Sequence, residues 1–386
     1  MSLPIVISAK PAGDVINTEF PDAAHRPSSR DLPSLDGLRA ASIVFVILGH
    51  ASEGRVSHLL ATILSRLAHF GVCVFFVISG YLITTLLRRE ASVRGNVNLK
   101  RFYLRRTLRI FPPYYVYLAA IAVGATLGGW ALPSNTRWWP ALTYLTNIFG
   151  TTWLLGHSWS LSIEEQFYVT WPIVLAMCIR RWGTAAGSHL ACRIAWCSLL
   201  VLPVLRVIVF GITRDGVVTT GLIFDFVAAG SALALFQASG EWIRARNILD
   251  RILRSDWTPL VAIVAMALHL SFTGTIRWRF AIDIVIVTPV EAVLLALFIG
   301  WAVMNPDHLV GRALNARALR FIGVGSYSLY IWQQLFLGPQ VPFANQWMLH
   351  SRLAAVGACA AVSYILVERP ALRLRARIEQ TKGLTQ

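Results

Sequence analysis

The stretch LDGLRAASIVFVILGH, residues 35–50, begins with a carboxylate and an arginine, continues almost entirely apolar and ends on a histidine. His50 follows Arg39 by eleven positions, which amounts to three helical turns plus about 20°, so the two side chains share one helix face about 16 Å apart along the axis. An ionisable group deep in a membrane helix is costly and is a candidate functional residue. The alternative is that His50 only reaches the outer interface and Arg39 is a topology anchor.

The composition of the whole chain supports a membrane protein. Its 386 residues are 56% hydrophobic and only 14% charged, whereas a soluble domain carries about 25% charged residues. A membrane helix needs roughly 20 apolar residues. We therefore predict an all-α polytopic membrane protein with about ten transmembrane helices, at about residues 36–53, 69–87, 112–132, 164–180, 194–213, 219–238, 257–276, 281–304, 321–341 and 350–367.

The net charge of +16 first suggests a nucleic-acid partner. With the N-terminus in the cytoplasm, however, most of the 35 Lys and Arg residues fall on the cytoplasmic side of the predicted spans, as the positive-inside rule requires. The charge is thus explained by topology, and we expect no nucleic-acid partner. An eleventh span at 138–156 would abolish this bias. We therefore predict ten spans, both termini in the cytoplasm and a re-entrant or interfacial segment near 138–163.

The ends of the chain differ from its apolar middle. Residues 1–34 are polar, lack the apolar core of a signal peptide and are predicted to be a disordered cytoplasmic tail. Residues 35–370 form the predicted transmembrane domain, and residues 371–386 a basic cytoplasmic tail. The five cysteines show neither disulfide-like nor metal-like spacing, so we expect buried free thiols and no metal.

A cluster of arginines precedes the third predicted span, in RFYLRRTLRIFPPYY, residues 101–115. Arg105, Arg106 and Arg109 fall at helical spacing before a proline pair that we expect to end or redirect the chain. Guanidinium groups bind phosphates bidentately, which favours a phosphate-bearing ligand. Positive-inside anchoring or contact with lipid headgroups is the alternative explanation.

A polar block on the predicted outer side reads GHSWSLSIEEQFYVTWP, residues 156–172. Ser162 and Glu165 have the spacing of a capping box at the start of the fourth span. Glu164 has no such structural role, and both carboxylates are candidates for a site. Trp159 belongs to an expected interfacial tryptophan belt, although an acceptor sugar could also stack there.

These motifs, with FFVISGYLIT (75–84), SYSLYIWQQ (326–334) and VERP (367–370), resemble the acyltransferase-3 family of integral membrane O-acyltransferases over about residues 33–370. The resemblance implies about ten spans in a bacterial inner membrane. It also implies transfer of an acyl group, most often acetyl from cytoplasmic acetyl-CoA, to a hydroxyl of a glycan or another acceptor. Membrane lipid and the acceptor are the expected partners.

The resemblance, together with the spacing of the arginines and the stacking surface of the tryptophan, predicts roles for particular residues. Those expected to act in catalysis are His50, Arg39, Glu164 and Glu165. Those expected to bind the cofactor acyl-CoA are Arg105, Arg106 and Arg109. Those expected to bind the acceptor substrate are Ser160, Trp159 and Asp225.

Two positions depart from the family pattern. Ile223 stands where the family often has an arginine, two residues before Asp225, and Gln333 stands where a histidine often follows Trp332. Both departures weaken any role assigned to these positions. They can also mark a subgroup that uses a different acceptor.

In the mechanism that we expect, the phosphates of CoA bind the arginines and the thin pantetheine arm carries the thioester toward His50. The histidine then acts either as a general base on the acceptor hydroxyl or as a nucleophile that forms an acyl-histidine, and the sequence leaves both open. Glu291 is expected to form a buried pair with an arginine such as Arg206, and His69 to be interfacial.

A proton-coupled multi-pass transporter is the main alternative, because such carriers also bury Asp, Glu and His within many spans. The absence of an internal repeat between the two halves of the sequence and the arginine cluster count against it. A catalytically silent scaffold for glycan assembly is a second alternative. Intact Arg39 and His50 argue against it.

Overall fold

The computed structural model describes residues 33–127, 130, 132, 137–213, 222–238, 243–271, 281–338 and 347–381. This part of the chain consists of helices and connecting turns, without a β-strand. Apart from Pro33 and Ser34, the predicted N-terminal tail lies outside the described residues. At the other end, α18 (Arg369–Thr381) makes much of the predicted C-terminal tail helical.

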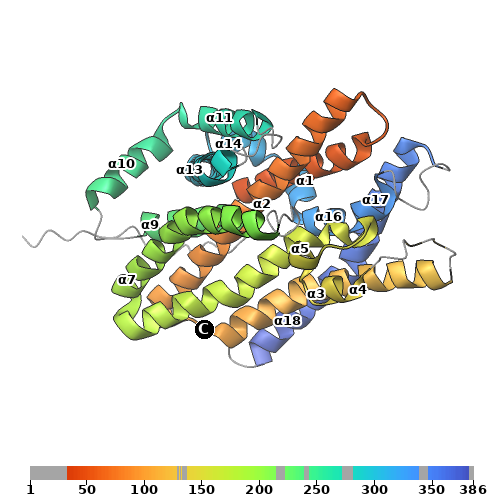
Figure 1. Ribbon diagram of the computed structural model, residues 1–386. Coiled ribbons are helices and arrows are strands. Elements are labelled where there is room, and N and C mark those ends of the chain that lie inside the picture. The colour runs from red at the N-terminus through yellow and green to blue at the C-terminus, as the bar shows by residue number, and fades with distance from the viewer. Residues whose placement is uncertain are drawn as a thin grey trace, which may run out of the picture. The chain divides into compact units, whose positions relative to one another are not determined.

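Helix α2 (His58–Arg94) forms the centre of the described structure and packs against α1 (Pro33–Ser52) and α9 (Asp225–Gln237) (Figure 1). It ends at Gly95, whose left-handed backbone (φ 75°) lets its N–H close the last turn on the Ala91 carbonyl, as is common for helix C-termini. Since α1 is continuous, Arg39 and His50 lie on one unbroken helix, as the sequence predicted.

The contact between α2 and α9 depends on two glycines. A Cβ atom built on Gly80 would lie 2.0 Å from the Val227 carbonyl oxygen, and one on Gly230 would lie 2.2 Å from the Val77 carbonyl oxygen. Small residues of this kind let membrane helices approach closely. The two backbones are therefore in direct contact.

Substituting either glycine by alanine should destabilise the protein, because each added methyl group must push two helix backbones apart. We expect Gly80→Ala and Gly230→Ala each to cost about 1–3 kcal/mol, measured as a lower thermal unfolding midpoint in detergent. Gly357→Ala is the matched control, because a Cβ atom there meets no atom within 4 Å. Equal midpoints for all three variants would show that the α2–α9 contact is not tight.

Helix α3 (Leu99–Thr126) is capped at its N-terminus by Asn98, whose side chain accepts a hydrogen bond from the Arg101 N–H at 3.0 Å. The prediction that the proline pair ends or redirects the chain is wrong, because Pro112 and Pro113 lie inside this helix. Prolines are tolerated in membrane helices where neighbouring groups satisfy the freed carbonyls. The missing N–H groups of this pair free the carbonyls of Leu108 and Arg109. The next carbonyl, that of Ile110, accepts a hydrogen bond from the Tyr327 hydroxyl at 2.6 Å, which ties α3 to residue 327.

The segment near 138–163 contains three short helices, α4 (Trp138–Leu142), α5 (Thr146–Phe149) and α6 (Trp153–Gly156), each too short to span a bilayer. Three tyrosines of α3 hold this segment by donating to its carbonyls. Tyr114 donates to Ala141 at 2.8 Å, Tyr115 to Leu142 at 2.9 Å and Tyr117 to Leu154 at 2.6 Å. Three backbone carbonyls of the segment are thus satisfied by protein side chains.

Helix α7 (Ser158–Thr213) is two helices joined at Gly183, which has non-helical dihedral angles (φ 77°, ψ 171°). This break separates the predicted spans at 164–180 and 194–213. The predicted capping box is wrong, because α7 begins at Ser158 and Ser162 already lies within it. The Ser162 hydroxyl instead donates to the Ser158 carbonyl at 2.9 Å.

The remaining helices follow in chain order. They are α10 (Ile243–Arg254), α11 (Thr258–Ser271), η2 (Asp283–Val287), α13 (Thr288–Met304), α14 (Leu309–Leu314), α15 (Arg317–Val324), α16 (Ser326–Phe336), α17 (Leu349–Ser363) and η3 (Tyr364–Glu368). The predicted span at 321–341 is thus broken at Gly325, between α15 and α16. Six helices among the described residues are long and apolar enough to cross a membrane, so the chain is a multi-pass membrane protein; ten spans and cytoplasmic termini stay predictions.

The cysteines are free, as predicted, but not all are buried. Cys73, Cys178 and Cys192 are buried, whereas Cys197 is exposed and Cys359 is half-buried. The expectation of five buried thiols is therefore wrong for the last two. Both lie on helix faces that the neighbouring described helices leave uncovered.

Candidate active site

A polar cavity lies between α1, α2, α3, α7 and α16. Its lining includes Arg39, Phe75, Phe76, Ser79, Arg106, Arg109, Ser160, Glu164, Tyr168, Tyr327 and Tyr330. Five residues that the sequence selected are brought together here from three separate helices: Arg39, Arg106, Arg109, Ser160 and Glu164. The lining carries three guanidinium groups and one carboxylate, so its formal charge is positive.

The arginines of this cavity are held differently. Arg39 forms an ion pair with Asp36 at 3.0 Å, one turn earlier in α1. Arg106 lies over the ring of Tyr168, 4.8 Å from its centroid, in a cation–π contact. Among the described residues, neither Arg106 nor Arg109 forms an ion pair within 4 Å. Their charge is therefore available to an anion in the cavity.

Arg105 does not line this cavity. Its guanidinium forms a bidentate ion pair with Glu379 of α18, in which Nη2 lies 3.0 Å from Oε2 and Nε contacts Oε1. The sequence grouped Arg105 with its two neighbours because all three follow at helical spacing. The structure separates them, since Arg105 faces α18 while Arg106 and Arg109 face the cavity.

The two adjacent glutamates of residues 156–172, Glu164 and Glu165, lie in different surroundings. Glu164 lines the cavity and accepts a hydrogen bond from Ser79 at 2.7 Å, and Ser79 in turn accepts one from Tyr168 at 3.0 Å. Glu165 does not line the cavity. Its Oε1 is buried and has no hydrogen-bond partner among the described residues.

The cavity is closed on the side of α7 by a hydroxyl pair. The Tyr330 hydroxyl donates to the His157 carbonyl at 3.0 Å, and Ser160 Oγ lies 2.5 Å from the same Tyr330 oxygen. The Ser160 hydroxyl also lies 3.3 Å from the His157 carbonyl, so both hydroxyls can donate to that oxygen and either can donate to the other. Ser160 thus lies at the wall of the cavity, next to Tyr330 of α16.

Two other residues that the sequence selected lie outside this cavity. Trp159 stacks on His69, with ring centroids 5.8 Å apart, and meets Phe76 edge-on. Asp225 is fully buried and forms an ion pair with Arg206. The predicted pairing of Glu291 with Arg206 is therefore wrong: Glu291 instead contacts His269 Nδ1 at 2.9 Å.

His50 faces protein near the C-terminal end of α1. Its ring packs edge-on against Trp153, with centroids 5.3 Å apart, and its Nδ1 lies 2.7 Å from Oε1 of Gln333 on α16. It is not part of the cavity lining. However, Tyr330, which is, lies one helical turn before Gln333. His50 therefore contacts the turn of α16 that follows the turn lining the cavity.

A chain of amide hydrogen bonds fixes the tautomer of His50. Gln334 Nε2 donates to the Trp153 carbonyl at 2.7 Å, so Gln334 Oε1 must face Gln333, whose Nε2 donates to it at 3.1 Å. Gln333 Oε1 is then left to face His50 Nδ1. Because this oxygen can only accept, Nδ1 carries the proton, and the neutral ring keeps its lone pair on Nε2.

Gln333 is the residue of this site that sequence reasoning missed. Its departure from the family pattern argues against a role in the site, yet Gln333 is fully buried and contacts His50 directly. The sequence feature that indicates this role is the residue type, a glutamine next to a second glutamine within an apolar helix. A fully apolar environment would not favour two consecutive buried amides, and their presence indicates a hydrogen-bond network.

Comparison with known proteins places this arrangement in a family. A family model described as an acyltransferase domain matches residues 32–368, most of the chain. The chain therefore belongs to the acyltransferase-3 family, as its motifs predicted. No solved structure matches it.

Its curated relatives are bacterial proteins. A protein of Bacillus subtilis (strain 168) named "Putative peptidoglycan O-acetyltransferase YrhL" is 28% identical over 88% of this chain and 55% of its own length. The peptidoglycan O-acetyltransferase OatA of Listeria monocytogenes is 25% identical over 93% of this chain and 58% of its own length. The chain thus spans about half the length of the curated relatives it matches.

Proposed function

We propose that this chain is a membrane O-acyltransferase that moves an acyl group, in the first instance acetyl, from cytoplasmic acyl-CoA to a hydroxyl of a cell-surface glycan. The observation that carries the proposal is the cavity in which Arg39, Arg106 and Arg109 converge, next to a histidine whose tautomer is fixed. Membership of the acyltransferase-3 family supports the same reaction class. It gives the transporter alternative no support.

The donor would bind by its charged end. Phosphates of CoA carry several negative charges, and Arg106 and Arg109 offer guanidinium groups that form no ion pair within 4 Å among the described residues. Arg39, which also forms an ion pair with Asp36, adds a third guanidinium group to the same cavity. Glu164 would remain outside the phosphate contact, because Ser79 holds its carboxylate on the α2 side.

The thioester would reach His50 along α1. The rise of a helix places Arg39 and His50 about 16 Å apart along the axis, a distance that an extended pantetheine arm can cover. His50 Nε2, with its lone pair, then either removes the proton of the acceptor hydroxyl as that oxygen attacks the thioester carbonyl, or attacks the carbonyl itself. In the first route, His50 passes the acceptor proton to the departing CoA thiolate, and CoA leaves as the thiol. In the second, CoA leaves as the thiolate, the acceptor hydroxyl then attacks the acyl-histidine, and the proton that this hydroxyl loses converts the thiolate to the thiol.

The acceptor that we propose is a glycan hydroxyl on the outer side. Two relatives bear the name peptidoglycan O-acetyltransferase, which makes peptidoglycan the first acceptor to test. Trp153, whose ring packs on His50, offers an aromatic face of the kind that binds sugars. Ser160 and Glu164 line the cavity and are proposed to orient the two substrates.

Removing the amide of Gln333 should slow the chemical step without weakening donor binding. Gln333→Leu takes away the acceptor for His50 Nδ1, and we expect kcat to fall about tenfold or more, the size of one lost hydrogen bond to a reacting group. The KM for acyl-CoA should stay unchanged, because the arginines are untouched. Steady-state kinetics on purified protein measures both constants.

Gln333→Glu is the matched control for that variant. In its protonated form, glutamic acid presents the same acceptor to His50 and the same donor to Gln334. Its kcat should therefore lie well above that of Gln333→Leu. If both variants lose activity equally, or if Gln333→Leu raises only KM, Gln333 does not position the imidazole.

The direct test of the function is acyl transfer by the purified protein in proteoliposomes. Radiolabelled acetyl-CoA is supplied with peptidoglycan fragments, and we expect base-labile label on the glycan that depends on both substrates. Flux of a solute without any transfer would overturn the enzyme proposal. Transfer to water alone, as CoA-dependent hydrolysis, would support the donor and reject peptidoglycan as the acceptor.

A further inference from the structure

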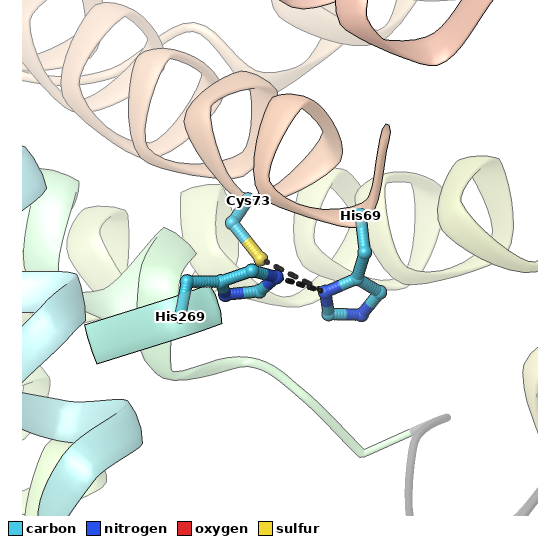
Figure 2. A group of neighbouring side chains, drawn as sticks. All are labelled: His69, Cys73 and His269. Atoms are coloured by element: carbon cyan, nitrogen blue, oxygen red, sulfur yellow. Dashed lines mark hydrogen bonds between the residues drawn. The ribbon is translucent and has the colours of Figure 1, made fainter. Parts of the chain in front are cut away.

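A second cluster of reactive side chains lies beside the cavity but outside it. Figure 2 shows His69 and Cys73, one turn apart on α2, and His269 on α11, with their ligand atoms pointing toward one another. One ligand atom from each residue lies within 4.8 Å of the others. It is the one such group of His, Cys, Asp or Glu found in the described part of the chain.

The two contacts of His69 Nδ1, drawn as hydrogen bonds in Figure 2, also have the spacing of ligand atoms around a metal ion. His69 Nδ1 lies 3.3 Å from His269 Nε2 and 3.7 Å from Cys73 Sγ. Around a tetrahedral zinc ion, with bonds of about 2.0–2.1 Å to nitrogen and about 2.3 Å to sulfur, neighbouring ligand atoms are about 3.3–3.6 Å apart. The two measured edges therefore fit such a coordination sphere.

The side chain of Glu291 orients one of the three ligands. Its Oε1 lies 2.9 Å from His269 Nδ1, so Nδ1 carries a proton and donates it, and the lone pair of His269 Nε2 points at His69 and Cys73. A carboxylate behind a ligating histidine is the usual arrangement at metal sites. Glu291 therefore has His269 as its partner, in place of Arg206, which was expected from the sequence.

The surroundings of the cluster restrict its chemistry. Cys73 is fully buried, and the side chains of His269 and Glu291 are 11% and 4% exposed. His69 is stacked between the rings of Trp159 and His269. A divalent ion bound to a Cys73 thiolate beside the Glu291 carboxylate would leave this buried site without net charge, which removes the main cost of burying each group alone.

We propose that His69, Cys73 and His269 bind a divalent transition-metal ion, Zn²⁺ in the first instance, which ties α11 to α2. Two imidazoles and a thiolate suit zinc and exclude hard ions such as Mg²⁺. Three protein ligands leave a fourth coordination position for a non-protein ligand such as a single water molecule. Trp159 stacks on His69 and touches Phe76, which lines the cavity, so the ion would brace one wall of that cavity. The proposal stands apart from the proposed acyl transfer.

The test is metal binding by the purified full chain, freed of any histidine tag and stripped with a chelator. We expect it to take up one Co²⁺ per chain with the absorption band of thiolate coordination, and one Zn²⁺ that displaces the cobalt and raises the thermal unfolding midpoint. Cys192→Ser, which changes a buried cysteine elsewhere, should behave as the wild type. Cys73→Ser should lose the band, and His269→Gln should bind at least tenfold more weakly.

Metal binding by the wild-type protein tests the proposal even if a variant fails to fold. Wild type that retains no metal after dialysis, or that binds cobalt without the thiolate band, would overturn the proposal. So would a band that persists in Cys73→Ser, because another cysteine would then be the ligand. The readouts are metal content, absorption and unfolding midpoint, so loss of acyl transfer in any variant does not enter the result.

Discussion

Replacing His50 by alanine is expected to lower acyl transfer by roughly 10²- to 10⁴-fold, the usual contribution of a general base or acid. The reason is that Nε2 of His50 provides the lone pair that the proposed reaction uses, and its fixed tautomer keeps that lone pair free of a proton. The measurement is the initial rate of transfer from radiolabelled acetyl-CoA at saturating substrate. His50→Ala protein should still bind the donor.

His58→Ala serves as the matched control for this variant, since His58 is exposed at the start of α2 and lies outside the cavity lining. It should transfer at the wild-type rate. Full activity in His50→Ala would end the proposed role of the imidazole. Loss of both activity and donor binding would point instead to a general disruption of the fold.

Neutralising two arginines of the cavity should weaken donor binding more than it slows the reaction. In the double variant Arg106→Gln, Arg109→Gln, we expect the apparent KM for acyl-CoA to rise about tenfold for each lost charge-assisted hydrogen bond, or about a hundredfold in total. The KM for the acceptor should change little, because the acceptor carries no phosphate for these groups. Kinetics with each substrate varied in turn measures both.

Arg105→Gln is the control that the structure supplies. It removes the same charge from the same helix, but from a side chain that pairs with Glu379 and does not line the cavity. We expect a much smaller change in the KM for acyl-CoA. If Arg105→Gln matches the effect of either cavity arginine, the cluster acts through its overall charge at the membrane surface and not through this cavity.

The sequence predicted those parts of the site that depend on one helix or on a family motif. Helical spacing alone put Arg39 and His50 on one helix, and α1 is continuous between them. The arginine cluster and the outer block were identified from their residue types. Arg106, Arg109 and Glu164 do converge on one cavity.

Features that depend on distant partners were not predicted. Helical spacing could not distinguish Arg105 from Arg109, because the choice is made by Glu379, far along the chain. The same holds for His69 and His269, which are 200 residues apart, so no local spacing could reveal the cluster. The hydrogen bond from the Tyr327 hydroxyl to the Ile110 carbonyl of α3 likewise joins groups that are far apart in the sequence.

The central claim is that a donor held by its phosphates at Arg106 and Arg109 presents its thioester to His50. A structure determined by electron cryomicroscopy in lipid nanodiscs, with an unreactive acetyl-CoA analogue bound, tests it most directly. The account predicts phosphate density against the two arginines and the sulfur position within contact of His50 Nε2. Phosphates bound elsewhere, or an arm that ends away from His50, would contradict it.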